Sequence, residues 1–163
     1  MRFVPGRGQA AARCLRAAAD LELRSGALYA RLAGREGAPG WLAELLRGMA
    51  REEEQHAVRI RLLERLVRAD AWPEHAVARI GADVDEARSV LAHLEAELGP
   101  PGPVSPAAVL HALVAVERTI DALHAEMMAS TVAPHVAGLF QALRAQDARH
   151  RELMRDAQEH RAG

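Results

Sequence analysis

The stretch Met49-Ala-Arg-Glu-Glu-Glu-Gln-His56 sets a carboxylate and an imidazole three residues apart inside a helix-forming segment. Residues i and i+3 project from the same side of a helix, so Glu53 and His56 share one face. That face is otherwise apolar, with Leu42, Leu45, Leu46 and Met49 before the pair and Ile60 and Leu63 after it. The pair therefore points inward, where an uncompensated carboxylate is costly.

The second half of the chain repeats this arrangement with Asp147 and His150. Glu53 follows a single glutamate, Glu22, by 31 residues, and Asp147 follows Glu117 by 30 residues. Each of these acids interrupts an apolar face in the middle of a helix-like segment. The repeat predicts two similar helical hairpins around a shared centre.

Glycine and proline divide the chain into helices, because strand-forming runs are nearly absent and Ala, Leu, Arg and Glu predominate. Breaks are expected at Glu36-Gly-Ala-Pro-Gly40 and Gly99-Pro-Pro-Gly-Pro103, and Ser105 is expected to cap a helix that starts with Pro106. The predicted helices span about 9–35, 41–69, 106–130 and 134–160, with a short extra helix near Val84–Leu98 in a crossover at 70–105.

Two antiparallel hairpins joined by one long crossover are typical of ferritin-like four-helix bundles. The fold class predicted for this chain is therefore all-α, with residues 1–163 forming a single ferritin-like domain. Glu22 and Glu53 are equally far from the first hairpin turn, and Glu117 and Asp147 are equally far from the second. Residues at equal distance from such a turn lie at the same height, so four carboxylates and two imidazoles should meet. This predicts a centre with two metal ions.

Composition and charge exclude several other classes of protein. The formal net charge is −1 and the 21 basic residues, all Arg, are scattered, so there is no basic surface for nucleic acid. Cys14 is the only cysteine, which excludes an internal disulfide and a Cys-x-x-Cys site. The first residues lack the apolar core of a signal peptide, and no segment has the apolar length of a membrane span. A cytoplasmic location is expected.

The residues Asp20–Ala33 followed by Met49–Ala57 resemble the di-iron domain of the rubrerythrin/ferritin-like superfamily, and the similarity covers residues 10–69 and 106–158. The resemblance implies two iron ions, although the carboxylate and imidazole donors also suit Mn or Zn. It further implies the ligand roles: Glu22 and Glu117 as terminal carboxylates, Glu53 and Asp147 as bridging carboxylates, and His56 and His150 as terminal imidazoles.

Three positions depart from the rubrerythrin pattern. Asp147 replaces the usual Glu and is one methylene shorter, Ile120 stands where rubrerythrins have a further Glu, and no Cys-x-x-Cys pair is present to form a rubredoxin-type iron centre. The resemblance implies an oxidoreductase that reacts with peroxide or O2, uses an external electron donor, needs no catalytic residue beyond the metal ligands and forms a homodimer. A ferroxidase or iron-handling protein and a metal-free helical interaction module are the alternatives.

Residues around the predicted ligands are assigned by their spacing. Tyr29 and His124 each follow a single glutamate by seven residues, and Asp121 lies close to His124. These three are candidates to hydrogen-bond the ligands. Glu52 and Glu54 are interpreted as part of a solvated helix face, with a contact between Glu54 and one of the ligands as the alternative for Glu54.

Overall fold

Helix-forming residues predominate throughout the chain, and helix is the only regular structure in the part of it that the structure describes. The computed structural model describes residues 7–66, 71–103 and 105–161. The helices are α1 (Arg7–Ala33), α2 (Gly40–Leu66), α3 (Glu74–Leu98), α4 (Pro106–Ser130) and α5 (Pro134–Arg161). The prediction of an all-helical bundle is confirmed.

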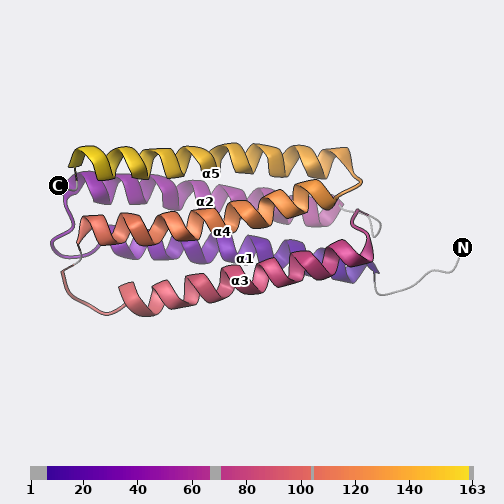
Figure 1. The fold of residues 1–163 in the computed structure, drawn as a ribbon, viewed down its shortest axis with the longest axis horizontal. Coiled ribbons are helices and arrows are strands. Elements are labelled where there is room, and N and C mark those ends of the chain that lie inside the picture. The colour runs from indigo at the N-terminus through magenta and orange to yellow at the C-terminus, as the bar shows by residue number, and fades with distance from the viewer. Residues whose placement is uncertain (1–6, 67–70, 104, 162–163) are drawn as a thin grey trace, which may run out of the picture.

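The five helices lie side by side along the long axis of the molecule, and consecutive helices run in opposite directions (Figure 1). At 25 to 28 residues each, they are about 40 Å long at ~1.5 Å per residue. Helix α1 packs along α2 and helix α4 packs along α5, whereas α3 covers α1 and α4 from outside. The two hairpins therefore enclose a shared centre to which α1, α2, α4 and α5 all contribute.

The predicted helix bounds agree with the structure to within a few residues. The prediction 106–130 coincides with α4, 134–160 differs from α5 by one residue, and 9–35 is shifted by two residues from α1. The last residues of the prediction 41–69 lie outside the described residues. The predicted N-cap is confirmed, because the Ser105 side chain accepts a hydrogen bond from the Ala108 backbone N–H.

The crossover differs from the prediction. Instead of a short helix near Val84–Leu98, α3 occupies most of the predicted 70–105 segment and has 25 residues. An apolar stripe continues along the whole of it, with Ala76, Ile80, Val84, Ala87, Leu91 and Leu94 buried at intervals of three or four. Gly81 lies inside this helix, where a glycine costs only about 1 kcal/mol relative to alanine. Burial of the stripe outweighs that cost, so the helix starts earlier than predicted.

Gly26 allows α1 and α2 to approach each other closely beside the centre. A Cβ atom at this position would lie 3.1 Å from the Ala50 carbonyl oxygen and 3.2 Å from the Glu53 Cβ. Both atoms belong to α2, and the first is backbone that a side chain cannot move aside. A glycine one turn after Glu22 thus brings the carboxylates of the two helices together.

Replacing Gly26 by leucine is expected to lower the free energy of unfolding by about 1–3 kcal/mol or more, because the side chain overpacks the α1–α2 contact. Gly48 on α2 is the matched control, since a Cβ there meets nothing within 4 Å. Gly48→Leu should be neutral or stabilise by up to about 1 kcal/mol through helix propensity. Chemical denaturation of both variants measures the difference. Equal stabilities would show that the two helices are not in close contact at Gly26.

No helix in the described ranges combines the length and the apolar character needed to cross a membrane.

Candidate metal centre

All six predicted ligands lie at the centre of the bundle, and each is at most 2% exposed. They come from four helices: Glu22 from α1, Glu53 and His56 from α2, Glu117 from α4, and Asp147 and His150 from α5. Among the described residues, the other buried polar side chains are His124, which also lies here, and Ser25, which donates a hydrogen bond to the Leu21 carbonyl oxygen. The structure thus gathers four carboxylates and three imidazoles in one apolar interior.

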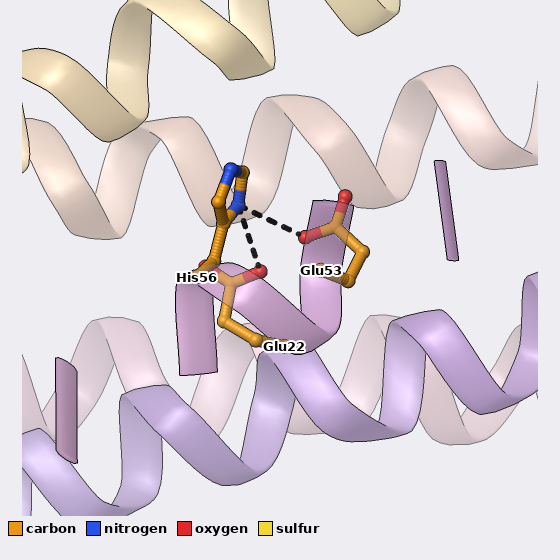
Figure 2. A group of neighbouring side chains, drawn as sticks. All are labelled: Glu22, Glu53 and His56. Atoms are coloured by element: carbon orange, nitrogen blue, oxygen red, sulfur yellow. Dashed lines mark ion pairs between the residues drawn. The ribbon is translucent and has the colours of Figure 1, made fainter. Parts of the chain in front are cut away.

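Three of these residues form one group that could hold a cation, here named the His56 position: Glu22, Glu53 and His56. The His56 Nδ1 atom lies 3.2 Å from Glu53 Oε2 and 3.6 Å from Glu22 Oε2. Figure 2 shows the ring turned so that this nitrogen faces both carboxylates while the other nitrogen points away from them. The three ligand atoms lie within 4.8 Å of one another, a spacing at which one metal ion can contact all three.

A second group, the His150 position, consists of Glu53, Glu117 and His150. The His150 Nδ1 atom lies 3.1 Å from Glu53 Oε1 and 3.4 Å from Glu117 Oε2. Glu53 belongs to both groups and offers a different oxygen to each. This is the geometry of a carboxylate that bridges two ions.

Asp147 lies in the centre but in neither group. Its Oδ2 atom is 2.8 Å from His124 Nδ1, and its Oδ1 atom is 4.0 Å from His56 Nδ1. Because an aspartate is one methylene shorter than a glutamate, its carboxylate stays close to α5, where His124 contacts it. The bridging role that the resemblance implies for Asp147 is therefore not formed in this arrangement.

Two of the three predicted neighbours contact the ligands. The Tyr29 hydroxyl donates a hydrogen bond of 2.6 Å to Glu117 Oε1. His124 Nε2 lies 3.0 Å from Glu22 Oε1, so His124 connects Glu22 with Asp147. Each side chain reaches from one hairpin to the single glutamate of the other. Asp121 does not take part in this way: it is half-buried and pairs with two arginines, Arg144 and Arg151.

Two residues that bind the histidines from outside were missed by the sequence interpretation. His56 Nε2 is 2.9 Å from Gln146 Oε1, and His150 Nε2 is 3.0 Å from Glu52 Oε2. The assignment of Glu52 to a solvated face was wrong. Both residues immediately precede the second acid of their hairpin, Glu53 or Asp147, and that repeat is the sequence signal that could have identified them.

These outer contacts determine how the imidazoles are oriented. Glu52 can only accept, and the Gln146 oxygen also accepts a hydrogen bond of 2.9 Å from Arg59. Both Nε2 atoms therefore carry the proton, which leaves the Nδ1 lone pair of each neutral ring facing the carboxylates. Such an outer acceptor is typical of histidines that bind metal ions.

Seven buried polar atoms of the centre have no hydrogen-bond partner: Glu22 Oε1 and Oε2, Glu53 Oε1, Asp147 Oδ1, His56 Nδ1, His124 Nε2 and His150 Nδ1. Several lie at ion-pair distances from each other, but the contacts do not have hydrogen-bond geometry. Buried polar atoms are rarely left without partners. Metal ions bound between the carboxylates and the Nδ1 atoms would supply partners for most of them, so the residues fit a metal pair.

In the absence of metal ions, protons are the only cations available to these carboxylates. Burial would lower the pKa of His56, but the carboxylates of Glu22 and Glu53 raise that pKa to about 10. The pKa of His124 is likewise raised to about 10, and that of His150 to about 11, by their carboxylate neighbours. Burial and the charge of Glu53 raise the pKa of Glu117 to about 7.

Glu22 behaves in the opposite way. Burial would raise its pKa, but contacts with Glu53 and with the two nearest imidazoles lower it to about 2. The metal-free centre is therefore a network of imidazolium ions and carboxylates. Metal binding must displace protons from the imidazoles, since a ligating histidine is neutral.

The metal-free protein should become less stable as the pH rises from about 6.5 to about 10. The pKa values of His56 and His124 are about 10 in the folded state against 6.5 as the ordinary value, so their contribution to stability is complete below pH 6.5 and is lost through pH 10. Glu22 contributes in the other direction: because its pKa is lowered from 4.5 to about 2, its contribution is lost as the pH falls through that range. Stability should therefore be greatest at mildly acidic pH.

Thermal unfolding of chelator-treated protein over this pH range measures the effect. The metal-loaded protein is the control, because its stability relative to the metal-free form should increase as protons cease to compete with the metal. A melting temperature of the metal-free protein that does not change above pH 6.5 would contradict the proposed network.

No known protein-family model matches the chain, and neither does any curated protein or solved structure. The buried carboxylates and imidazoles are therefore the basis for a functional assignment.

Proposed function

We propose that the protein is a non-haem di-iron oxidoreductase, in which α1, α2, α4 and α5 form a ferritin-like bundle of the rubrerythrin type. The observation that carries the proposal is that Glu53 faces both candidate positions, with one oxygen toward His56 and the other toward His150. Two unrelated groups of buried polar residues would have no reason to share a side chain. A site for two neighbouring ions, in contrast, is typically built around a carboxylate that contacts both of them. The equal spacing of the acids in the two hairpins supports the same proposal.

Five of the six residues predicted from the sequence would hold the two ions, and the sixth, Asp147, lies beside them in contact with His124. His56 and His150 would bind through Nδ1, Glu22 and Glu117 would each bind one ion, and Glu53 would contact both. A pair of ferrous ions, when bound, supplies the two electrons that reduction of one peroxide molecule to water requires. Tyr29 holds Glu117 in place through its hydrogen bond, and the surrounding apolar side chains exclude bulk water.

Electrons must then be returned to the site from another molecule. The sequence has one cysteine, Cys14, and burial raises the pKa of its thiol, which makes it a poor redox group. It also cannot form a four-cysteine iron centre alone. An external electron donor is therefore part of the proposal.

A metal-free bundle is the second candidate, and the ion pairs of the centre are the observation in its favour. Each of the three buried histidines lies within 3.2 Å of a carboxylate oxygen, so imidazolium ions can neutralise much of the acidic charge without metal. Metal analysis of protein expressed in iron-supplied medium, together with its absorption spectrum, separates the candidates. Two iron ions per chain support the oxidoreductase, and protein that neither retains nor takes up metal supports the metal-free bundle.

A further inference from the structure

The two inward-facing histidines have outer partners of different charge. His150 Nε2 donates to the carboxylate of Glu52, whereas His56 Nε2 donates to the neutral amide of Gln146. The two partners occupy equivalent places in the sequence, because each immediately precedes the second acid of the opposite hairpin. A carboxylate acceptor makes an imidazole a more basic ligand than an amide acceptor does. His150 should therefore bind a cation more tightly than His56.

The single glutamates of the two positions are held in a similar way. At the His56 position, His124 Nε2 lies 3.0 Å from Glu22 Oε1, and Glu22 Oε2 is left toward His56. At the His150 position, the Tyr29 hydroxyl donates to Glu117 Oε1, and Glu117 Oε2 is left toward His150. One oxygen of each glutamate is thus available to an ion, so the charge of the outer partner is the difference that sets the order of binding.

We propose that the two positions are inequivalent, that the His150 position takes the first metal ion, and that Glu52 and Gln146 are the positioning residues that set this order. The inference rests on the proposed function, since it requires that both positions bind metal. Glu52 and Gln146 act through the histidines and do not contact the ions themselves.

Isothermal titration of the metal-free protein with Co²⁺, followed also by the visible absorption of the bound ion, tests the order. The wild-type protein should bind two ions in two separate steps. Glu117→Gln removes a ligand of the His150 position alone and should abolish the tighter step. Glu22→Gln removes a ligand of the His56 position alone and should abolish the weaker step while leaving the tighter one.

Exchanging the outer partners then tests their role. Glu52→Gln should weaken the first step by about 10- to 100-fold, the range typical for loss of a partner that orients a metal-binding histidine. Gln146→Glu should strengthen the second step, so that the two steps move closer together or reverse in order. Glu54→Gln is the matched control, because Glu54 is an exposed glutamate on the same helix, and should change neither step. Helical circular dichroism of each variant checks that it is folded.

The outcomes distinguish this inference from the proposed function. Two equal steps that neither exchange alters, or loss of the tighter step in Glu22→Gln, would overturn the inference and leave a two-metal site intact. Wild-type protein that binds no Co²⁺, Mn²⁺ or Fe²⁺ would overturn both. Two steps that respond to Glu52→Gln but not to Glu54→Gln support both.

Discussion

Replacing Glu53 by alanine is expected to abolish stoichiometric metal binding at both positions, whereas the wild-type chain binds two ions. Glu53 is the one residue shared by the two groups, and it faces His56 with Oε2 and His150 with Oε1. Its removal takes one of three ligands from each position and also removes the connection between the ions. Anaerobic dialysis against Fe²⁺, followed by metal and protein analysis, measures the loss.

Two further variants make the result specific. Glu54→Ala changes the next residue of α2, which is exposed, and should still bind two ions. Glu53→Gln keeps the size of the buried side chain and removes its charge, so a loss of metal in this variant cannot be attributed to a cavity in the core. Retention of two ions by Glu53→Ala would show that Glu53 is not a ligand and that the assigned helix register is wrong.

The reduced protein with two Fe²⁺ per chain is expected to be oxidised by peroxide in a stoichiometry of one peroxide per metal pair. Sustained turnover should require an added electron donor, because Cys14 is the only thiol of the chain. Peroxide is expected to react somewhat faster than O2. The preference should be small, since Ile120, a buried residue one turn after Glu117, stands where rubrerythrins have an additional carboxylate.

Matched pulses of peroxide and O2 on the anaerobically loaded protein, followed by stopped-flow absorption, measure both rates. Protein carrying Glu53→Ala, mixed with the same amount of Fe²⁺, is the control for oxidation of free iron. Faster reaction with O2 and accumulation of ferric mineral would support a ferroxidase. Absence of any reaction above the control would support the metal-free bundle.

Much of the fold could be predicted because glycine and proline mark the ends of the helices clearly. The turns beside Gly37 and after Ser130 are short, so distance from the turn determines height along each hairpin. That relation placed Glu22 opposite Glu53 without any knowledge of packing. The length of α3 was not predicted, because Gly81 interrupts its helical pattern and only burial against α1 and α4 compensates for it.

The centre could be predicted less completely. The buried acids and histidines of the centre interrupt apolar helix faces. This pattern can be recognised in the sequence of one helix alone, so these residues could be predicted. Glu52 and Gln146 lie at the edge of such a face, and their contacts with His150 and His56 arise only from the distance between α2 and α5. The same holds for Asp147. The sequence shows that its side chain is shorter than that of the usual Glu, but its contact with His124 depends on how α4 packs on α5.

X-ray diffraction at the iron absorption edge, from crystals of the protein loaded anaerobically with Fe²⁺, tests the central claim most directly. We expect two anomalous peaks in each chain, one beside Glu53 Oε1 and His150 Nδ1 and the other beside Glu53 Oε2 and His56 Nδ1. Crystals of fully folded protein with no anomalous peak between these side chains, or with peaks only at the surface, would contradict it.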